Sequence, residues 1–307
     1  MPRFVCAILA LAWLVCPAGA QAAPSVVASI KPVHGVVAAL TDGVTRPRAL
    51  VTGGASPHTY SLRPSDARAL AGADLAVWVG PGLERFLAGP MESLAADARV
   101  VRLAGVDGLT RLPVRRAGVF AADGGRPEKA AGAGHCDINM PLWLDPHNVL
   151  AWIGPLVDAL KAVDPAHADA YEANAKAFRQ RLEKLDAALA ARLAPGTDVP
   201  YVLFHDAYAY FEHRYGLTPA GVVTVDPGRK PGARRLRAIR RAIRERDVRC
   251  VFREPQFAPA LVETIVAGTP ARVGVLDPLG ADLEGGPGFY PALLRNLADG
   301  YTGCLGQ

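Results

Sequence analysis

Residues 48–70, RALVTGGASPHTYSLRPSDARAL, contain the patterns of a strand, a loop and the start of a helix. The apolar run that ends at Val51 predicts a short strand, and two glycines and a proline then predict a loop. A helical pattern begins at Arg63, with Pro64 in its first turn. His58 therefore lies just past the carboxyl end of a strand, where open α/β sheets bind their ligands.

Two further strands end in side chains that can bind a metal. His205 follows the apolar run 201–204, and Asp277 follows the run 271–276. Each run predicts a buried parallel strand, so both side chains are expected at the carboxyl edge of a sheet. Two imidazoles and one carboxylate suit a zinc-like ion. The sequence therefore predicts a metal site made of His58, His205 and Asp277.

Strand and helix patterns alternate on both sides of one long helical stretch. Asp164 and Pro165 open this stretch, apolar residues then recur at spacings of three and four, and Pro195 with Gly196 ends it. About thirty helical residues extend roughly 45 Å, which is enough to cross two domains. We therefore predict an α/β fold with an N-terminal domain (23–163), a linker helix (164–194) and a C-terminal domain (195–307). Residues 142–144, just before the helix at Pro146, are expected to be extended.

The amino terminus has the pattern of an export signal. Arg3 precedes the apolar run 4–15, which is too short to span a bilayer, and residues 18–22 offer small-residue cleavage sites. We expect a cleaved signal peptide over residues 1–22 and an oxidising compartment for the mature chain. Half of the residues are apolar and 21% are charged, which predicts a globular protein.

The basic residues are concentrated in one segment. Nine arginines and lysines lie within residues 229–246, mostly on one predicted helix, in a chain whose net charge is only +5. This segment has neither interleaved aromatic residues nor a nucleic-acid-binding motif, so no nucleic-acid partner is expected. The arginines are interpreted as a solvated helix face.

Several motifs together resemble a known family. They are Ser29-Ile30-Lys31-Pro32, GGASPHTYSLRPSDA, LWLDP at 142–146, FHDAY at 204–208, EPQF at 254–257 and LDPLG at 276–280. Over residues 26–305 the chain resembles the periplasmic zinc-binding components of bacterial ABC importers. The resemblance implies two Rossmann-like domains joined by one long rigid helix, and a periplasmic monomer. It implies zinc as the transported ligand and a permease in the inner membrane as partner.

The resemblance also implies a disulfide between Cys250 and Cys304. With Cys6 and Cys16 inside the signal peptide, the bridge leaves Cys136 as the odd cysteine of the mature chain.

One position departs from the family pattern. The zinc receptors carry a metal-binding histidine directly before the Leu-Trp-Leu run, whereas this chain has Pro141, which offers no donor atom. His135 is the candidate that could replace the missing ligand, and Cys136 and His147 are further candidates. Zinc binding is therefore expected to be weaker than in a receptor with three histidines, unless one of these side chains completes the site.

Other interpretations stay open. The manganese receptors of the same group carry a carboxylate where His205 stands, and the softer imidazole favours zinc. A degenerate receptor with weak or altered metal binding is consistent with Pro141. A zinc hydrolase would need a general base beside the metal, and the chain has no HExxH or comparable motif, so no enzyme activity is expected.

Overall fold

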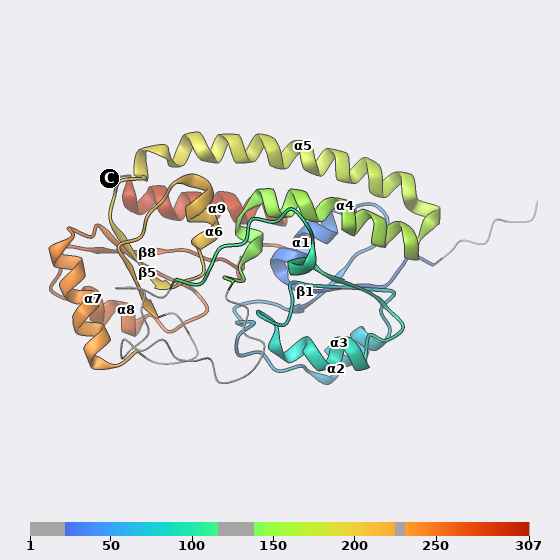
Figure 1. The fold of residues 1–307 in the computed structure, drawn as a ribbon, viewed down its shortest axis with the longest axis horizontal. Coiled ribbons are helices and arrows are strands. Elements are labelled where there is room, and N and C mark those ends of the chain that lie inside the picture. The colour runs from blue at the N-terminus through green and yellow to red at the C-terminus, as the bar shows by residue number, and fades with distance from the viewer. Residues whose placement is uncertain (1–21, 116–137, 225–230, 307) are drawn as a thin grey trace, which may run out of the picture.

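This computed structural model describes residues 22–115, 138–224 and 231–306. They form two α/β halves, each built on a sheet of four parallel strands (Figure 1). The expected signal peptide lies outside this part except for its last residue, and His135 and Cys136 also lie outside it. No helix of the described part is both long and apolar enough to cross a membrane.

The first sheet has the strand order β2-β1-β3-β4, and each neighbouring pair is parallel. Helices α1 and α4 cover one face, and α2 and α3 cover the other (Figure 1). Because both faces are covered, the central strands β1 and β3 are buried at every position. The bounds are β1 (Val26–Ile30), α1 (Lys31–Leu40), β2 (Arg48–Val51), α2 (Pro64–Ala71), β3 (Leu75–Trp78), α3 (Ala88–Ser93), β4 (Arg99–Arg102) and α4 (Pro146–Val163).

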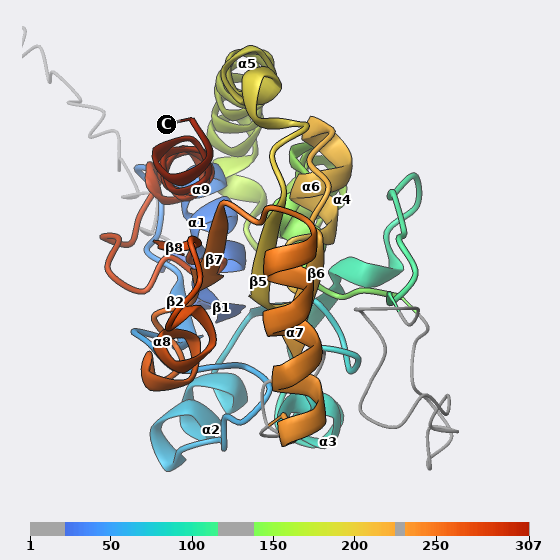
Figure 2. The ribbon, with the colours of Figure 1, turned by 90° about the vertical axis from the view of Figure 1, so that its left-hand side faces the viewer.

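The second sheet repeats this arrangement with the order β6-β5-β7-β8, again entirely parallel. Helices α7 and α8 lie on one side of it, and α6 and α9 lie toward α5 on the other (Figures 1 and 2). The bounds are β5 (Tyr201–His205), α6 (Ala209–Tyr215), β6 (Gly221–Thr224), α7 (Ala233–Glu245), β7 (Cys250–Arg253), α8 (Ala260–Val266), β8 (Arg272–Val275) and α9 (Phe289–Leu305). The sequence analysis did not predict α9.

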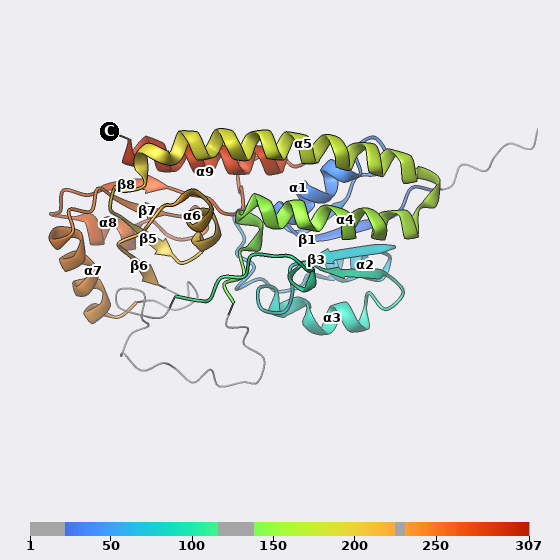
Figure 3. The same ribbon diagram turned by 45° about the horizontal axis from the view of Figure 1, so that its top comes forward.

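Helix α5 (Ala168–Leu193) is one unbroken helix of 26 residues. It runs along both halves of the molecule (Figure 3), packing on α1 and α4 of the first half and on α6 and α9 of the second. At 1.5 Å per residue it is about 39 Å long. The predicted long connecting helix is therefore confirmed. The ends of the predicted stretch, Pro165–His167 and Ala194–Gly196, are 3₁₀ turns.

The two halves share one apolar core. Buried side chains from both belong to a single continuous cluster that includes Val33, Trp143, Tyr290 and Leu297. The Tyr290 hydroxyl donates a hydrogen bond to the Trp143 carbonyl at 2.6 Å. Gly35 of α1 lies so close to α9 that a Cβ atom there would be 2.5 Å from the Phe289 ring. Apolar contact of this kind opposes free movement of one half against the other.

The expected disulfide is confirmed. Cys250 of β7 is bonded to Cys304 of α9, with their Cα atoms 6.2 Å apart. The bridge attaches the last helix to the central part of the second sheet, because β7 lies between β5 and β8.

The expectation of an extended segment at 142–144 is wrong, since Leu142–Leu144 forms a 3₁₀ turn. All three side chains are buried. Burial alone does not separate the two conformations, because β1 and β3 are also buried at every position. The turn leads directly into α4, whose first turn is capped by the Asp145 carboxylate, which accepts a hydrogen bond from the His147 backbone N–H.

Candidate metal site

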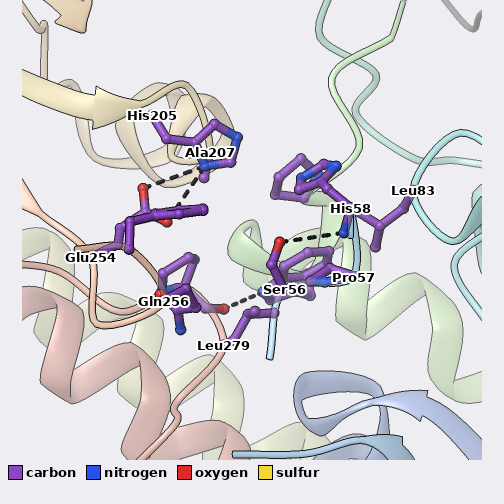
Figure 4. A pocket seen from close by; sticks show the side chains of 13 residues that line it. Ser56, Pro57, His58, Leu83, His205, Ala207, Glu254, Gln256 and Leu279 are labelled. Atoms are coloured by element: carbon purple, nitrogen blue, oxygen red, sulfur yellow. Dashed lines mark hydrogen bonds and ion pairs between the residues drawn. The ribbon is translucent and has the colours of Figure 1, made fainter. Parts of the chain in front are cut away.

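A pocket lies where the carboxyl ends of the two sheets meet (Figure 4). The first half contributes loops that follow β2 and β3, and the second half contributes the ends of β5 and β7 and the loop after β8. The residues that line it include His58, Leu83, Trp143, His205, Glu254 and Leu279. The location is the one that parallel α/β sheets provide for ligands.

The two predicted histidines meet in this pocket. His58 lies on the loop between β2 and α2 and is exposed, and its backbone N–H donates to the Ser56 hydroxyl at 3.3 Å. His205 is the last residue of β5 and only 7% exposed. The two imidazole centroids are 5.5 Å apart and the rings are nearly perpendicular. The strand ends thus bring together two nitrogen donors that lie 147 residues apart in the sequence.

Glu254 is a pocket residue to which the sequence analysis gave no role. It directly follows β7, the neighbour of β5, and is 3% exposed. Its two carboxylate oxygens lie 3.4 and 3.5 Å from Nδ1 of His205 (Figure 4). Burial raises the pKa of the Glu254 carboxyl, and the neighbouring His205 opposes that shift. The signal in the sequence was an acidic residue directly after an apolar strand, within the EPQF motif.

Asp277 lies apart from the two histidines. It follows β8 by two residues, and its carboxylate accepts hydrogen bonds from the backbone N–H groups of Leu279, Gly280 and Ala281 and from Nε2 of Gln256. It does not line the pocket. Within the described ranges no three His, Cys, Asp or Glu side chains are grouped closely enough to hold a metal ion.

The loop after Asp277 is also held from the first half of the molecule. The ammonium of Lys31, the first residue of α1, donates to the carbonyls of Gly280, Ala281 and Leu283 at 2.7, 2.9 and 2.7 Å. Partial burial lowers the pKa of Lys31, and the negative charge of Asp277 opposes this shift. Lys31 and Asp277 thus fix opposite sides of the same backbone, the lysine through carbonyls and the aspartate through N–H groups.

The position at which the resemblance implies a metal-binding histidine, which is Pro141 in this chain, lies at the pocket. Pro141 lines it, directly before the turn at Leu142–Leu144. His147 does not line it, and its Nε2 faces Asp186 of α5 at 3.3 Å. Of the candidates for an additional ligand, His135 and Cys136 lie outside the described residues.

Two parallel α/β halves, one long connecting helix and a histidine-lined pocket between the sheets are the architecture of a solute receptor that holds its ligand between two halves. The family model for the zinc-uptake complex component A, periplasmic, matches residues 26–304. The high-affinity zinc uptake system protein ZnuA of Brucella suis is 43% identical over 306 residues, with 92% of each chain covered.

Solved structures agree with the sequence comparison. A crystal structure of ZnuA has a TM-score of 0.78 and 29% identity and covers 92% of this chain and 99% of its own. A zinc-bound crystal structure of a ZnuA deletion mutant has a TM-score of 0.76 and 27% identity, with 92% and 98% covered. The chain belongs to the ZnuA family of periplasmic zinc-uptake components.

Proposed function

We propose that this protein captures zinc in the periplasm and delivers it to an ABC permease in the inner membrane. Membership of the zinc-uptake family supports the proposal. The observation that carries it is the pair of imidazoles, His58 and His205, whose centroids are 5.5 Å apart in the pocket between the sheets. Two imidazoles favour zinc over the harder manganese and magnesium ions.

Glu254 prepares His205 for this role. When Nδ1 of the imidazole donates its proton to the carboxylate, the lone pair for a metal lies on Nε2. Such outer carboxylates fix the ring orientation of metal-binding histidines and raise their basicity. The buried end of the site is thus oriented by two adjacent strands, β5 and β7.

Asp277 and His135 are proposed as the remaining ligands. Oδ2 of Asp277 is the oxygen available to zinc, because it accepts one N–H, from Ala281, and keeps a second lone pair, whereas Oδ1 accepts three hydrogen bonds. We further propose that the chain acts as a monomer, that residues 1–22 are removed on export, and that the domain boundaries lie at 163/164 and 194/195. As a receptor it would bind and release zinc without chemical change.

Zinc titration of the chelator-stripped mature protein, in competition with a chromogenic chelator, tests the proposal. We expect one zinc per chain, and a loss of affinity of at least about a hundredfold in His58→Ala and in His205→Ala, since a ligand should matter more than its outer partner. His213→Ala, which changes an exposed histidine of α6, is the matched control and should bind like the wild type. Undiminished affinity in both pocket variants would overturn the assignment.

A receptor with altered metal binding is the second candidate. Two observations favour it: the pocket is lined by Pro141, where the resemblance implies a histidine, and Asp277 does not line the pocket and accepts backbone N–H groups instead. The same titration decides between the candidates. A wild-type protein that binds zinc no better than its His58→Ala variant, or that prefers manganese, would support the second one.

A further inference from the structure

Helix α7 presents a straight row of exposed arginines. Arg234, Arg237, Arg241 and Arg244 are all exposed. Their spacings of three, four and three residues place them on one side of the helix. Over ten residues the row extends about 15 Å. We call these four residues the arginine stripe.

The opposite side of α7 fixes the direction in which the stripe points. Ile239 and Ile243 are fully buried in the core of the second half. Arg235 is also buried, and its guanidinium donates to the carbonyls of Val222 and Val223 of β6. Figure 2 shows α7 along the outer end of this half, in front of the sheet. The stripe is therefore a fixed surface of the fold and not a mobile tail.

The arginine stripe destabilises helix α7 in the isolated protein. Like charges three and four residues apart on a helix repel one another and destabilise it. Arg241 pairs with Glu245 of the same helix at 3.7 Å, but both side chains are exposed, and such surface pairs contribute little. An anionic partner would relieve this repulsion.

The chemistry of the stripe favours phosphate groups over a protein partner. Specific protein interfaces need apolar or aromatic side chains at their centre. The exposed large apolar residues of the described chain are Leu94, Val100, Val273 and Val275, and none lies on α7. Guanidinium groups bind phosphate oxygens in pairs of hydrogen bonds. Four of them along a line, without an apolar anchor, suit a surface of many phosphates.

We infer that the arginine stripe of α7 docks this protein on an anionic phospholipid surface. The inference goes beyond zinc capture, because the pocket is lined by residues of other elements. It also complements the proposed function, since a receptor held at the membrane surface would search for its permease by diffusion along the membrane plane. Removing the stripe should leave zinc affinity unchanged, so the two proposals can fail separately.

Sedimentation with vesicles tests the inference. The mature wild-type protein should sediment with vesicles of equal parts phosphatidylglycerol and phosphatidylcholine and not with phosphatidylcholine alone. Its partition coefficient should fall steeply as salt shortens the screening length from about 30 Å at 0.01 M to about 8 Å at 0.15 M. Each Arg→Gln change in the stripe should reduce the partition coefficient about fivefold at low salt, and all four together by more than about a hundredfold.

A variant of equal charge is the control. It replaces four exposed basic residues outside α7, namely Arg46, Arg68, Lys176 and Arg181, by glutamine. This variant should retain most of the binding, because its remaining charges are still aligned. Equal losses in the two quadruple variants, or no preference of the wild type for phosphatidylglycerol, would overturn the inference. Zinc titration and circular dichroism show that each variant is folded.

Discussion

Replacing Glu254 by glutamine removes a negative charge from beside His205 while keeping the shape of the side chain. The carboxylate is almost completely buried, and both of its oxygens lie within 3.5 Å of the imidazole Nδ1. A glutamine amide can still accept the Nδ1 proton, but it cannot stabilise the positive charge that a zinc-bound imidazole carries. We therefore expect Glu254→Gln to fold normally and to bind zinc more weakly.

The size of the loss follows from the kind of contact. A hydrogen bond to a charged acceptor contributes about 1.5–3 kcal/mol and a neutral one about 0.5–1.5 kcal/mol. The midpoints of these ranges differ by about 1.25 kcal/mol, which corresponds to roughly an eightfold change in the dissociation constant. Glu254→Ala also releases the imidazole from its orientation, so its loss should approach about a hundredfold. Thermal stability of the metal-free Glu254→Gln protein should not fall, because burial already disfavours the charged carboxylate.

Competition with a zinc chelator near neutral pH gives both dissociation constants. Asp164→Asn is the matched control, because Asp164 is another buried carboxylate that pairs with a histidine, His167, at 2.7 Å. It lies at the start of the long helix, outside the pocket lining. The control should keep wild-type affinity. Glu254→Gln with unchanged affinity, or a control with the same loss, would show that the His205–Glu254 contact does not orient a metal ligand.

Three further predictions concern other parts of the chain. Changing both Cys250 and Cys304 to alanine opens a connection of 54 residues and should reduce the free energy of unfolding by about 4 kcal/mol, measured by urea denaturation; an unchanged midpoint would contradict this. If the site lacks a ligand, Pro141→His should tighten zinc binding and His135→Ala should have little effect, whereas the reverse pattern would show that His135 completes the site. Burial raises the pKa of Glu84 from 4.5 to about 7, so the folded state holds this proton more tightly than the unfolded chain, and stability should fall as pH rises between these values. Glu84→Gln should remove that part of the pH dependence, and an unaltered slope in urea denaturation would refute it.

The location of His58 and His205 at strand ends could be predicted because it depends on local sequence patterns. His58 lies on the loop after β2 and His205 ends β5, and parallel strands carry their ligands at their carboxyl ends. The long helix could also be predicted, since its apolar spacing continues from Tyr171 to Leu193 without a break. In both cases a short-range pattern is enough to place the residues on their elements, whereas the contact between the two histidines depends on how the two sheets face each other.

The side-chain partners could not be predicted in the same way. Asp277 ends a strand as expected, but its carboxylate turns to the backbone N–H groups of its own loop, which Lys31 holds from the other half. An aspartate at the start of a turn commonly makes such contacts, so Asp277 followed by Pro278 and Gly280 gave a signal for this alternative. The pairing of Glu254 with His205 requires knowing that β7 lies next to β5, which the order of strands in the sequence does not give.

The two pocket histidines are held with different rigidity by the elements that carry them. His205 ends a buried strand and faces a buried carboxylate, so moving it would disturb the core of the second half. His58 is exposed on the loop after β2, which contains Gly53 in the left-handed region at φ 62°. The halves themselves share one core across Gly35, Phe289 and Tyr290, and separating them would expose apolar surface. Local movement of an exposed loop costs far less than opening such a core. His205 is therefore the fixed side of the proposed site, and His58 is the side that can move at lower cost.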